Sequence, residues 1–202
     1  MGAKCCKGKE KYPHLFSPIR IGNIRLKNRI IAAPTSPSMI TTEGHFTPEM
    51  TAYLEEKAKG GAAVVTYGES IVHSATGKSH NKQLQLDSFG VKQGMAETAR
   101  AIHNAGAYAN IQLSHGGKYG GLVSVGGDQD GCEVAYGPSH EMTPAGEVQE
   151  MPRDLIFEII DFYGKGAKLC KDCGFDMVQV HAANGWLFSQ FLSPVTNQRK
   201  DE

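Results

Sequence analysis

Short apolar runs alternate with stretches of helical periodicity along most of this chain. Four of the runs have the length and residue types of β-strands, and they cover 29–34, 62–67, 108–113 and 175–181. The periodic stretches predict helices at 47–59, 89–105 and 152–173, and a short helix that begins near Trp186. Strands that alternate with helices in this way are typical of a parallel sheet joined by right-handed crossovers.

Local signals mark the ends of these helices. Thr47 and Pro48 are suited to be an N-cap and a first helical residue, and Gly60-Gly61 provides a stop. In the second helix, one stripe carries the apolar residues Val91, Met95, Ala99 and Ile102. The run at 62–67 shows no polar alternation, which predicts a strand that is buried on both faces.

Two architectures fit this order of elements, an open doubly wound sheet and a TIM barrel. A dinucleotide-binding open sheet needs GxGxxG after its first strand, and this chain has Pro34-Thr35-Ser36-Pro37 there. Gly77-Lys78-Ser79 is not the end of a P-loop, because Val72 stands where that motif needs glycine. The elimination favours an α/β fold, a TIM (β/α)8 barrel. The Gly-rich stretch 114–151 is expected to be a loop that shapes the substrate pocket.

The length of the chain limits how much of a barrel it can form, and its charge limits the kinds of partner that it can bind. The chain has 202 residues, fewer than the roughly 250 of a complete TIM barrel, so we expect only about four βα units. They would occupy 15–202, after a flexible leader at 1–14. Lys plus Arg and Asp plus Glu number 21 each, which argues against a nucleic-acid partner. No apolar run approaches the roughly 20 residues of a membrane span.

The five cysteines do not suggest a disulfide framework, because their number is odd and their spacing irregular. A cytoplasmic protein is therefore expected. Cys170 and Cys173 form a CxxC, but this motif closes a helix before Gly174 and does not open one. The helix dipole would then not lower a thiol pKa, and we interpret both residues as helix-end cysteines without a metal.

Polar residues gather where the predicted strands end, which is where parallel α/β folds bind ligands. His181 and Asn184, at the fourth exit, are suited to donate two hydrogen bonds to one oxygen. Gln112 lies in an apolar run, where its amide needs a ligand or a neighbouring backbone group as partner. Thr35 and Ser36 either contact a ligand or cap turns. His115, before two glycines, is interpreted as a loop residue.

Three groups of motifs resemble the old yellow enzyme family. They are Leu15-Phe16-Ser17-Pro18-Ile19 with Leu26-Lys27-Asn28-Arg29-Ile30 and Ala33-Pro34-Thr35; Gln112-Leu113-Ser114-His115-Gly116-Gly117; and His181-Ala182-Ala183-Asn184-Gly185-Trp186-Leu187, followed by Gln190-Phe191-Leu192-Ser193-Pro194 and Asn197-Gln198-Arg199. The resemblance extends from about His14 to Glu202. Within the family, the chain is most similar to 2,4-dienoyl-CoA reductases and bile-acid-type NADH:flavin oxidoreductases.

The resemblance implies an FMN-bearing TIM barrel that acts as an ene-reductase. NADH or NADPH would reduce the flavin, and flavin N5 would pass hydride to the β-carbon of an α,β-unsaturated carbonyl or an enoyl or dienoyl thioester. The substrate is thus a small molecule. By resemblance, the flavin contacts are Ala33, Pro34, Thr35, Ser36, Gly68 and Gln112. His181 and Asn184 would hold the substrate carbonyl oxygen as an oxyanion hole, with Trp186 in the substrate pocket.

Two features depart from the family's pattern. Many relatives have tyrosine at the position of Trp186, as the acid that protonates the α-carbon, and an indole N–H is no usable acid. Solvent, or another group such as Tyr119, would replace it. The chain also stops after the fourth strand, before the family's later flavin ligands. FAD and an iron–sulfur cluster would belong only to a longer form, since these cysteines do not match the cluster motif.

Two other hypotheses follow from the same residues. A hydrolase or lyase without flavin would use the same barrel, metal-assisted through His115 and His181, with Glu69 as the nearest carboxylate. Alternatively, the chain is an inactive fragment because its cofactor site is incomplete.

Overall fold

The computed structural model describes residues 8–120 and 134–201, and a parallel sheet forms its centre. The strand order is β10-β6-β4-β3, with β5 paired to β4. The strands are β3 (Ile31–Thr35), β4 (Val64–Ile71), β5 (Leu84–Gln85), β6 (Tyr108–Ser114) and β10 (Met177–Val180). The four strands expected from the sequence are confirmed with shifted ends, whereas β5 was not expected.

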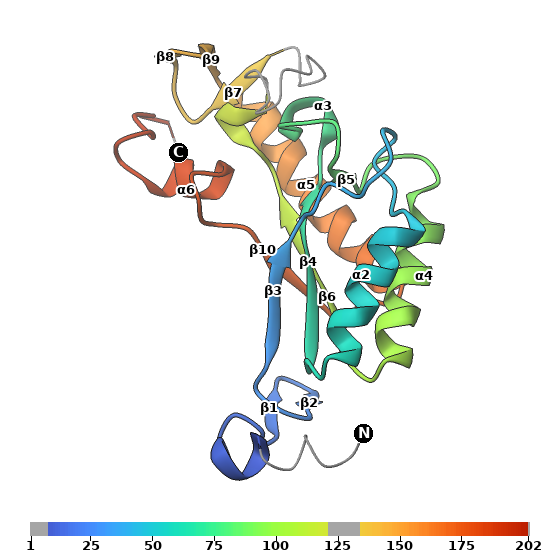
Figure 1. The fold of residues 1–202 in the computed structure, drawn as a ribbon. Coiled ribbons are helices and arrows are strands. Elements are labelled where there is room, and N and C mark those ends of the chain that lie inside the picture. The colour runs from blue at the N-terminus through green and yellow to red at the C-terminus, as the bar shows by residue number, and fades with distance from the viewer. Residues whose placement is uncertain (1–7, 121–133, 202) are drawn as a thin grey trace.

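Three long helices, α2 (Pro48–Lys59), α4 (Val91–Asn104) and α5 (Arg153–Asp172), lie on the same side of this sheet (Figure 1). The four expected strands follow one another across the sheet in chain order. A doubly wound sheet reverses its strand order and carries helices on both faces. The observed arrangement is instead that of the first four βα units of a TIM barrel.

The helix signals in the sequence are confirmed. Thr47 caps α2, because its Oγ1 accepts a hydrogen bond from the Met50 backbone N–H at 3.2 Å. The predicted stripe of α4 is buried along its whole length, and residues 62–67 are buried as well. Residues of these two elements and of α2 belong to the main hydrophobic cluster, together with residues of β6 and α5.

Several short elements were missed. Strands β1 (Ile19–Ile21) and β2 (Ile24–Leu26) form an antiparallel hairpin. The loop expected over 114–151 is wrong for its described part. That part contains a 3-10 turn, η1 (Gly117–Tyr119), and a separate sheet of β7 (Ala135–Gly137), β8 (Glu141–Thr143) and β9 (Gly146–Glu150). Strands of three to five residues with few buried side chains leave little periodicity for sequence analysis to detect.

The structure also shows the short helices, the CxxC cysteines and part of the N-terminal leader. Short helices occur at α3 (Ser74–Gly77) and, as expected after Trp186, at α6 (Leu187–Leu192). Cys173 is the C-cap residue of α5, and burial raises the pKa of Cys170 to about 12, so its thiol stays protonated. Of the expected leader, residues 8–11 form a helical turn, and residues 1–7 lie outside the described range. Within 8–120 and 134–201, no helix is long and apolar enough to cross a bilayer.

Candidate functional site

The exits of β3, β4, β6 and β10 surround a cavity of about 680 Å³. Its walls are Pro34, Thr35, Ser36, Gly68, Glu69, Gln112, Gln179, Val180, His181, Ala182, Ala183, Asn184 and Trp186. The site residues predicted from the sequence therefore all line one cavity, except Ala33. The Ala33 side chain is exposed outside the cavity, and its carbonyl accepts a hydrogen bond from Thr35 Oγ1 at 3.1 Å.

Gly68 of β4 lies between Pro34 of β3 and Gln112 of β6. A β-carbon at this position would be 2.6 Å from Pro34 Cβ and 2.9 Å from Gln112 Oε1. Real side chains do not approach so closely, so any larger residue would displace the strand or the amide. Glycine at this position thus keeps the cavity wall between Pro34 and Gln112 free of side-chain atoms.

Gln112 is 7% exposed, yet its amide forms no hydrogen bond with another residue in the described part of the chain. A buried amide usually has a partner, and this one lines a cavity. Gln179 is its register partner on β10 and lines the same cavity. Sequence analysis missed Gln179, although it precedes the strand exit at His181 by two residues, as Gln112 precedes Ser114.

His181 is the first residue after β10, and its backbone N–H donates to the Leu113 carbonyl of β6 at 2.9 Å. The imidazole is 8% exposed and lies beside the Trp186 indole, with ring centroids 5.4 Å apart. Burial lowers the pKa of His181, while the Glu69 carboxylate opposes that change. No side chain or backbone group among the described residues hydrogen-bonds to the imidazole.

Asn184 and Gly185 reverse the direction of the loop that follows β10. Both have positive φ, 57° for Asn184 and 75° for Gly185. Glycine adopts this conformation readily, and asparagine does so more often than most other residues, which explains why these two residue types occur at this turn. The exposed Asn184 amide, like the His181 ring, has no hydrogen-bond partner among the described residues. Two polar side chains are therefore available to a ligand in the cavity.

The hydroxyl groups of Thr35 and Ser36 already have protein partners. Thr35 Oγ1 donates to the Ala33 carbonyl and accepts from Lys57 Nζ at 3.2 Å. Ser36 Oγ lies 3.5 Å from the hydroxyl of Tyr67, whose pKa burial raises to about 12. Of the two roles expected for these residues, Thr35 caps a turn through its bond to Ala33. Both residues also line the cavity.

Glu69 is a lining residue that sequence analysis considered only as a metal-site carboxylate. Its Oε1 lies 3.4 Å from His80 Nε2, and its side chain is 20% exposed. No lysine or arginine is among the described residues that line the cavity. Its place directly after Gly68, at the end of a predicted strand, could have identified Glu69 as a lining residue from the sequence.

His115 does not join the cavity. It lies in the loop between β6 and η1, as expected, and it is fully buried there. The Gly117 backbone N–H donates to Nδ1 at 3.0 Å, so Nε2 carries the proton and donates to Thr76 Oγ1 at 3.0 Å. Burial, together with nearby His73, lowers the pKa of His115 to about 3. With both nitrogens engaged, His115 cannot share a metal ion with His181.

The Tyr119 hydroxyl lies against the loop that carries Asn184. A β-carbon at Gly185 would be 3.2 Å from the Tyr119 oxygen. Tyr119 is not among the residues that line the cavity, whereas Trp186 is. Tyr119 therefore contacts this loop at Gly185 without lining the cavity.

Comparison with known proteins places nearly the whole chain in one protein family. The sequence profile of the NADH:flavin oxidoreductase / NADH oxidase family matches residues 14–202. NADH oxidase of Thermoanaerobacter brockii is 32% identical over 196 residues, which make up 95% of this chain and 29% of that protein. Cinnamate reductase of Clostridium sporogenes is 30% identical over 203 residues, 96% of this chain and 30% of that protein. The chain thus spans less than a third of these relatives.

Solved structures agree with the sequence comparison. A 2-naphthoyl-CoA reductase in complex with 2-naphthoyl-CoA superposes with a TM-score of 0.85 at 32% identity, covering 94% of this chain and 30% of that one. The old yellow enzyme from Pichia sp. AKU4542 gives 0.84 at 25% identity, covering 93% and 50%. Morphinone reductase in complex with tetrahydroNAD gives 0.80 at 26% identity, covering 94% and 55%. The predicted fold, a partial N-terminal barrel, is thereby confirmed.

Proposed function

Because this chain belongs to the NADH:flavin oxidoreductase / NADH oxidase family, we propose that it forms the first half of the FMN barrel of an ene-reductase. The reaction would transfer hydride from NADH or NADPH, through the flavin, to the β-carbon of an α,β-unsaturated carbonyl or an enoyl or dienoyl thioester. One observation carries this proposal. Gln112, His181 and Asn184 line one cavity at the strand exits, and none of their side chains has a hydrogen-bond partner among the described residues.

The residues present fit FMN. The free amide of Gln112 offers both a donor and an acceptor, which suits the alternating donors and acceptors of a pyrimidine edge. Gly68 keeps the adjoining wall free of side-chain atoms, so that a flat ring system can approach the backbone. FMN, when bound, would supply the redox chemistry by accepting hydride from the nicotinamide and delivering it to the substrate. The protein's own contribution is to bind, orient and polarise.

His181 and Asn184 would polarise the substrate. Negative charge builds up on the carbonyl oxygen as the β-carbon receives hydride, and two N–H groups placed at that oxygen stabilise the charge. The lowered pKa of His181 keeps its imidazole neutral at pH 7. In that state the ring donates through a single N–H, and the Asn184 amide supplies the second donor.

The proton for the α-carbon must come from another source. Trp186 stands beside His181 and can donate a hydrogen bond, but its indole is not an acid at neutral pH. Tyr119 lies outside the lining of the cavity. We therefore assign this proton to solvent.

The similar proteins support a conjugated carbonyl compound as substrate. By their names, they act on 2-naphthoyl-CoA, cinnamate and morphinone. We extend only the shared chemistry to this protein, a small molecule with an activated C=C bond. We also keep residues 15–202 as one partial barrel domain and the cytoplasm as its compartment, together with the flavin contacts assigned above.

The test uses the protein expressed from its complete reading frame. We expect it to purify with FMN or to take up one equivalent, to be bleached by NADH or NADPH without oxygen, and to be reoxidised by 2-cyclohexen-1-one or crotonyl-CoA. His181→Ala should lose the last step, whereas the matched variant His140→Ala, in an exposed pair with Glu147, should keep it. A protein that takes up no FMN, or a reduced flavin that neither alkene reoxidises, would contradict the proposal.

A further inference from the structure

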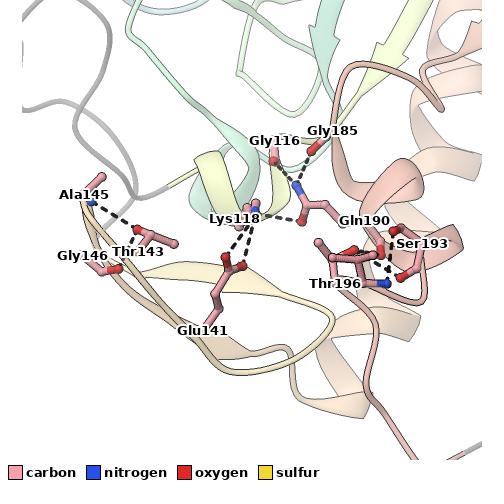
Figure 2. A network of polar contacts seen from close by, with 11 residues as sticks. Gly116, Lys118, Glu141, Thr143, Ala145, Gly146, Gly185, Gln190, Ser193 and Thr196 are labelled. Carbon is pink, nitrogen blue, oxygen red and sulfur yellow. Dashed lines mark hydrogen bonds and ion pairs between the residues drawn. The ribbon is translucent and has the colours of Figure 1, made fainter.

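A second buried amide lies close to the cavity and differs from Gln112 in its surroundings. Gln190 belongs to α6 and is 2% exposed. Its Nε2 donates to the carbonyl oxygens of Gly116 at 3.0 Å and of Gly185 at 2.6 Å, and its Oε1 accepts from the Lys118 backbone N–H at 3.0 Å (Figure 2). Both amide hydrogens and the oxygen are thus in use.

These three bonds join two separate loops. Gly116 and Lys118 belong to the loop after β6, and Gly185 belongs to the loop after β10, which carries His181 and Asn184. The fit around the amide is tight, because a β-carbon at Gly117 would collide with Gln190. The backbone of the loop after β6 therefore packs directly against the Gln190 amide, with no room for a side chain between them.

The helix that carries Gln190 is itself held at both ends. The Leu187 backbone N–H donates to the His115 carbonyl at 3.1 Å, which attaches the start of α6 to the exit of β6. Thr196 Oγ1 donates to the Gln190 carbonyl at 2.5 Å, and Asn197 Nδ2 donates to the Phe191 carbonyl at 2.9 Å. Gln190 therefore projects from a fixed support.

The loop needs such an external support. Asn184 makes no side-chain hydrogen bond of its own within the described residues, and both it and Gly185 hold positive φ. Inside the loop, the Trp186 backbone N–H donates to the Ala183 carbonyl at 3.1 Å. The Gly185 carbonyl, one peptide away from Asn184, points outward to Gln190. Holding this carbonyl restrains Gly185, and through Gly185 it restrains the Asn184–Gly185 peptide that adjoins the Asn184 side chain.

We propose that Gln190 is a positioning residue for the oxyanion pair: by holding the Gly185 carbonyl against the loop after β6, it aims the Asn184 amide into the cavity beside His181. The inference rests on the proposed function, because it assigns the purpose of the bonds to that pair. Gln190 itself does not line the cavity. Its effect is therefore transmitted through the loop.

Three variants separate positioning from general damage. Gln190→Glu keeps the size and the acceptor but removes both N–H donors and faces two carbonyls with a carboxylate. Gln190→Met keeps the approximate length and fills the same space without hydrogen bonds, so a folded variant is available if the charge proves intolerable. Glu141→Gln is the matched control, because it breaks the ion pair with Lys118 Nζ at 3.0 Å in the same network and leaves the Gln190 bonds intact.

Two measurements on the full-length protein decide the question. The first is amide hydrogen exchange of the 181–190 segment without substrate, which we expect to become at least tenfold faster in both Gln190 variants and to stay unchanged in Glu141→Gln. The second uses enzyme reduced with dithionite and compares reoxidation by 2-cyclohexen-1-one with reoxidation by ferricyanide, which needs no oxyanion pair. We expect the first rate to fall at least 30-fold and the second to stay within twofold.

The outcomes are distinct. Enone reoxidation within threefold of wild type in both variants, an equal fall in both reoxidation rates, or unchanged exchange would each overturn the assignment of Gln190. A wild-type protein that reduces no alkene would overturn the proposed function instead, and hydrogen exchange would still show whether Gln190 holds the loop.

Discussion

Two histidines directly follow neighbouring strands, His115 after β6 and His181 after β10, and their surroundings are opposite. Both are buried. The His115 nitrogens are engaged by Gly117 and Thr76, whereas the His181 ring has no hydrogen-bond partner among the described residues and lines the cavity. Burial therefore does not distinguish the two histidines. The number of filled hydrogen-bonding positions does.

The same contrast holds for the buried amides of Gln112 and Gln190. Gln190 uses its full hydrogen-bonding capacity to join two loops, while Gln112 offers its capacity to the cavity. A buried polar group without a partner costs free energy, so its presence indicates a ligand that would supply the partner. We expect substitutions at His181 and Gln112 to impair binding and catalysis directly, those at Gln190 to impair catalysis through the loop, and those at His115 to lower stability.

The largest expected effect is on catalysis. Removing one donor from an oxyanion site typically lowers the rate 10²–10³-fold, so His181→Ala and Asn184→Ala should each lower kcat/KM for 2-cyclohexen-1-one by about that factor. Steady-state kinetics with His140→Ala as the control would measure it. A loss of less than about threefold in both variants would mean that the pair does not hold the carbonyl oxygen.

The next largest effect is on stability, and here the substitution at His115 should matter more than the one at His181. His115→Ala deletes one buried and one partly buried hydrogen bond and leaves a cavity, which should lower the free energy of unfolding by about 3 kcal/mol. His181→Ala breaks no side-chain hydrogen bond and should cost much less. Urea unfolding of the two variants compares them directly, and equal losses would remove the distinction between the two histidines.

A smaller effect follows from pH. The pKa of His115 is lowered to about 3 in the folded state, so the unfolded chain takes up this proton first as pH falls below 6.5. Stability from this group is complete above pH 6.5 and is lost toward lower pH, by about 2 kcal/mol between pH 7 and 5. His115→Gln should be less sensitive to pH by that amount in urea unfolding. Parallel curves for variant and wild type would show that His115 titrates normally.

The smallest effect is on cofactor affinity. Gly68→Ala places a methyl group against Pro34 and the Gln112 oxygen, and we expect FMN binding to weaken about tenfold, which corresponds to roughly 1.4 kcal/mol. Gly164→Ala in α5 is the control, since a β-carbon there meets no atom within 4 Å and should only favour the helix. Flavin fluorescence titration measures both. Unchanged affinity in Gly68→Ala would place the flavin elsewhere.

The sequence predicted the parallel sheet and its three long helices. Of the nine site residues that it assigned, eight line the cavity. Periodicity of buried residues carried the first part, as the stripe from Val91 to Ile102 shows. It could not detect β7 to β9, where Val148 is the only buried residue of β9. The sequence also separated His115, as a loop residue, from His181, but it could not show what engages His115, because those partners come from residue 76 and from its own turn. Such contacts depend on how the strand exits are brought together.

The most direct test of the cavity as an FMN site compares the two amides in one experiment. In ¹H–¹⁵N spectra of the full-length protein, with side-chain assignments from Gln112→Asn and Gln190→Asn, FMN is added stepwise. We expect the Gln112 side-chain amide signals to shift and to saturate at one equivalent, while those of Gln190 stay in place. Saturable FMN binding that leaves Gln112 unshifted, or the absence of saturable binding, would contradict the assignment of this cavity to the flavin.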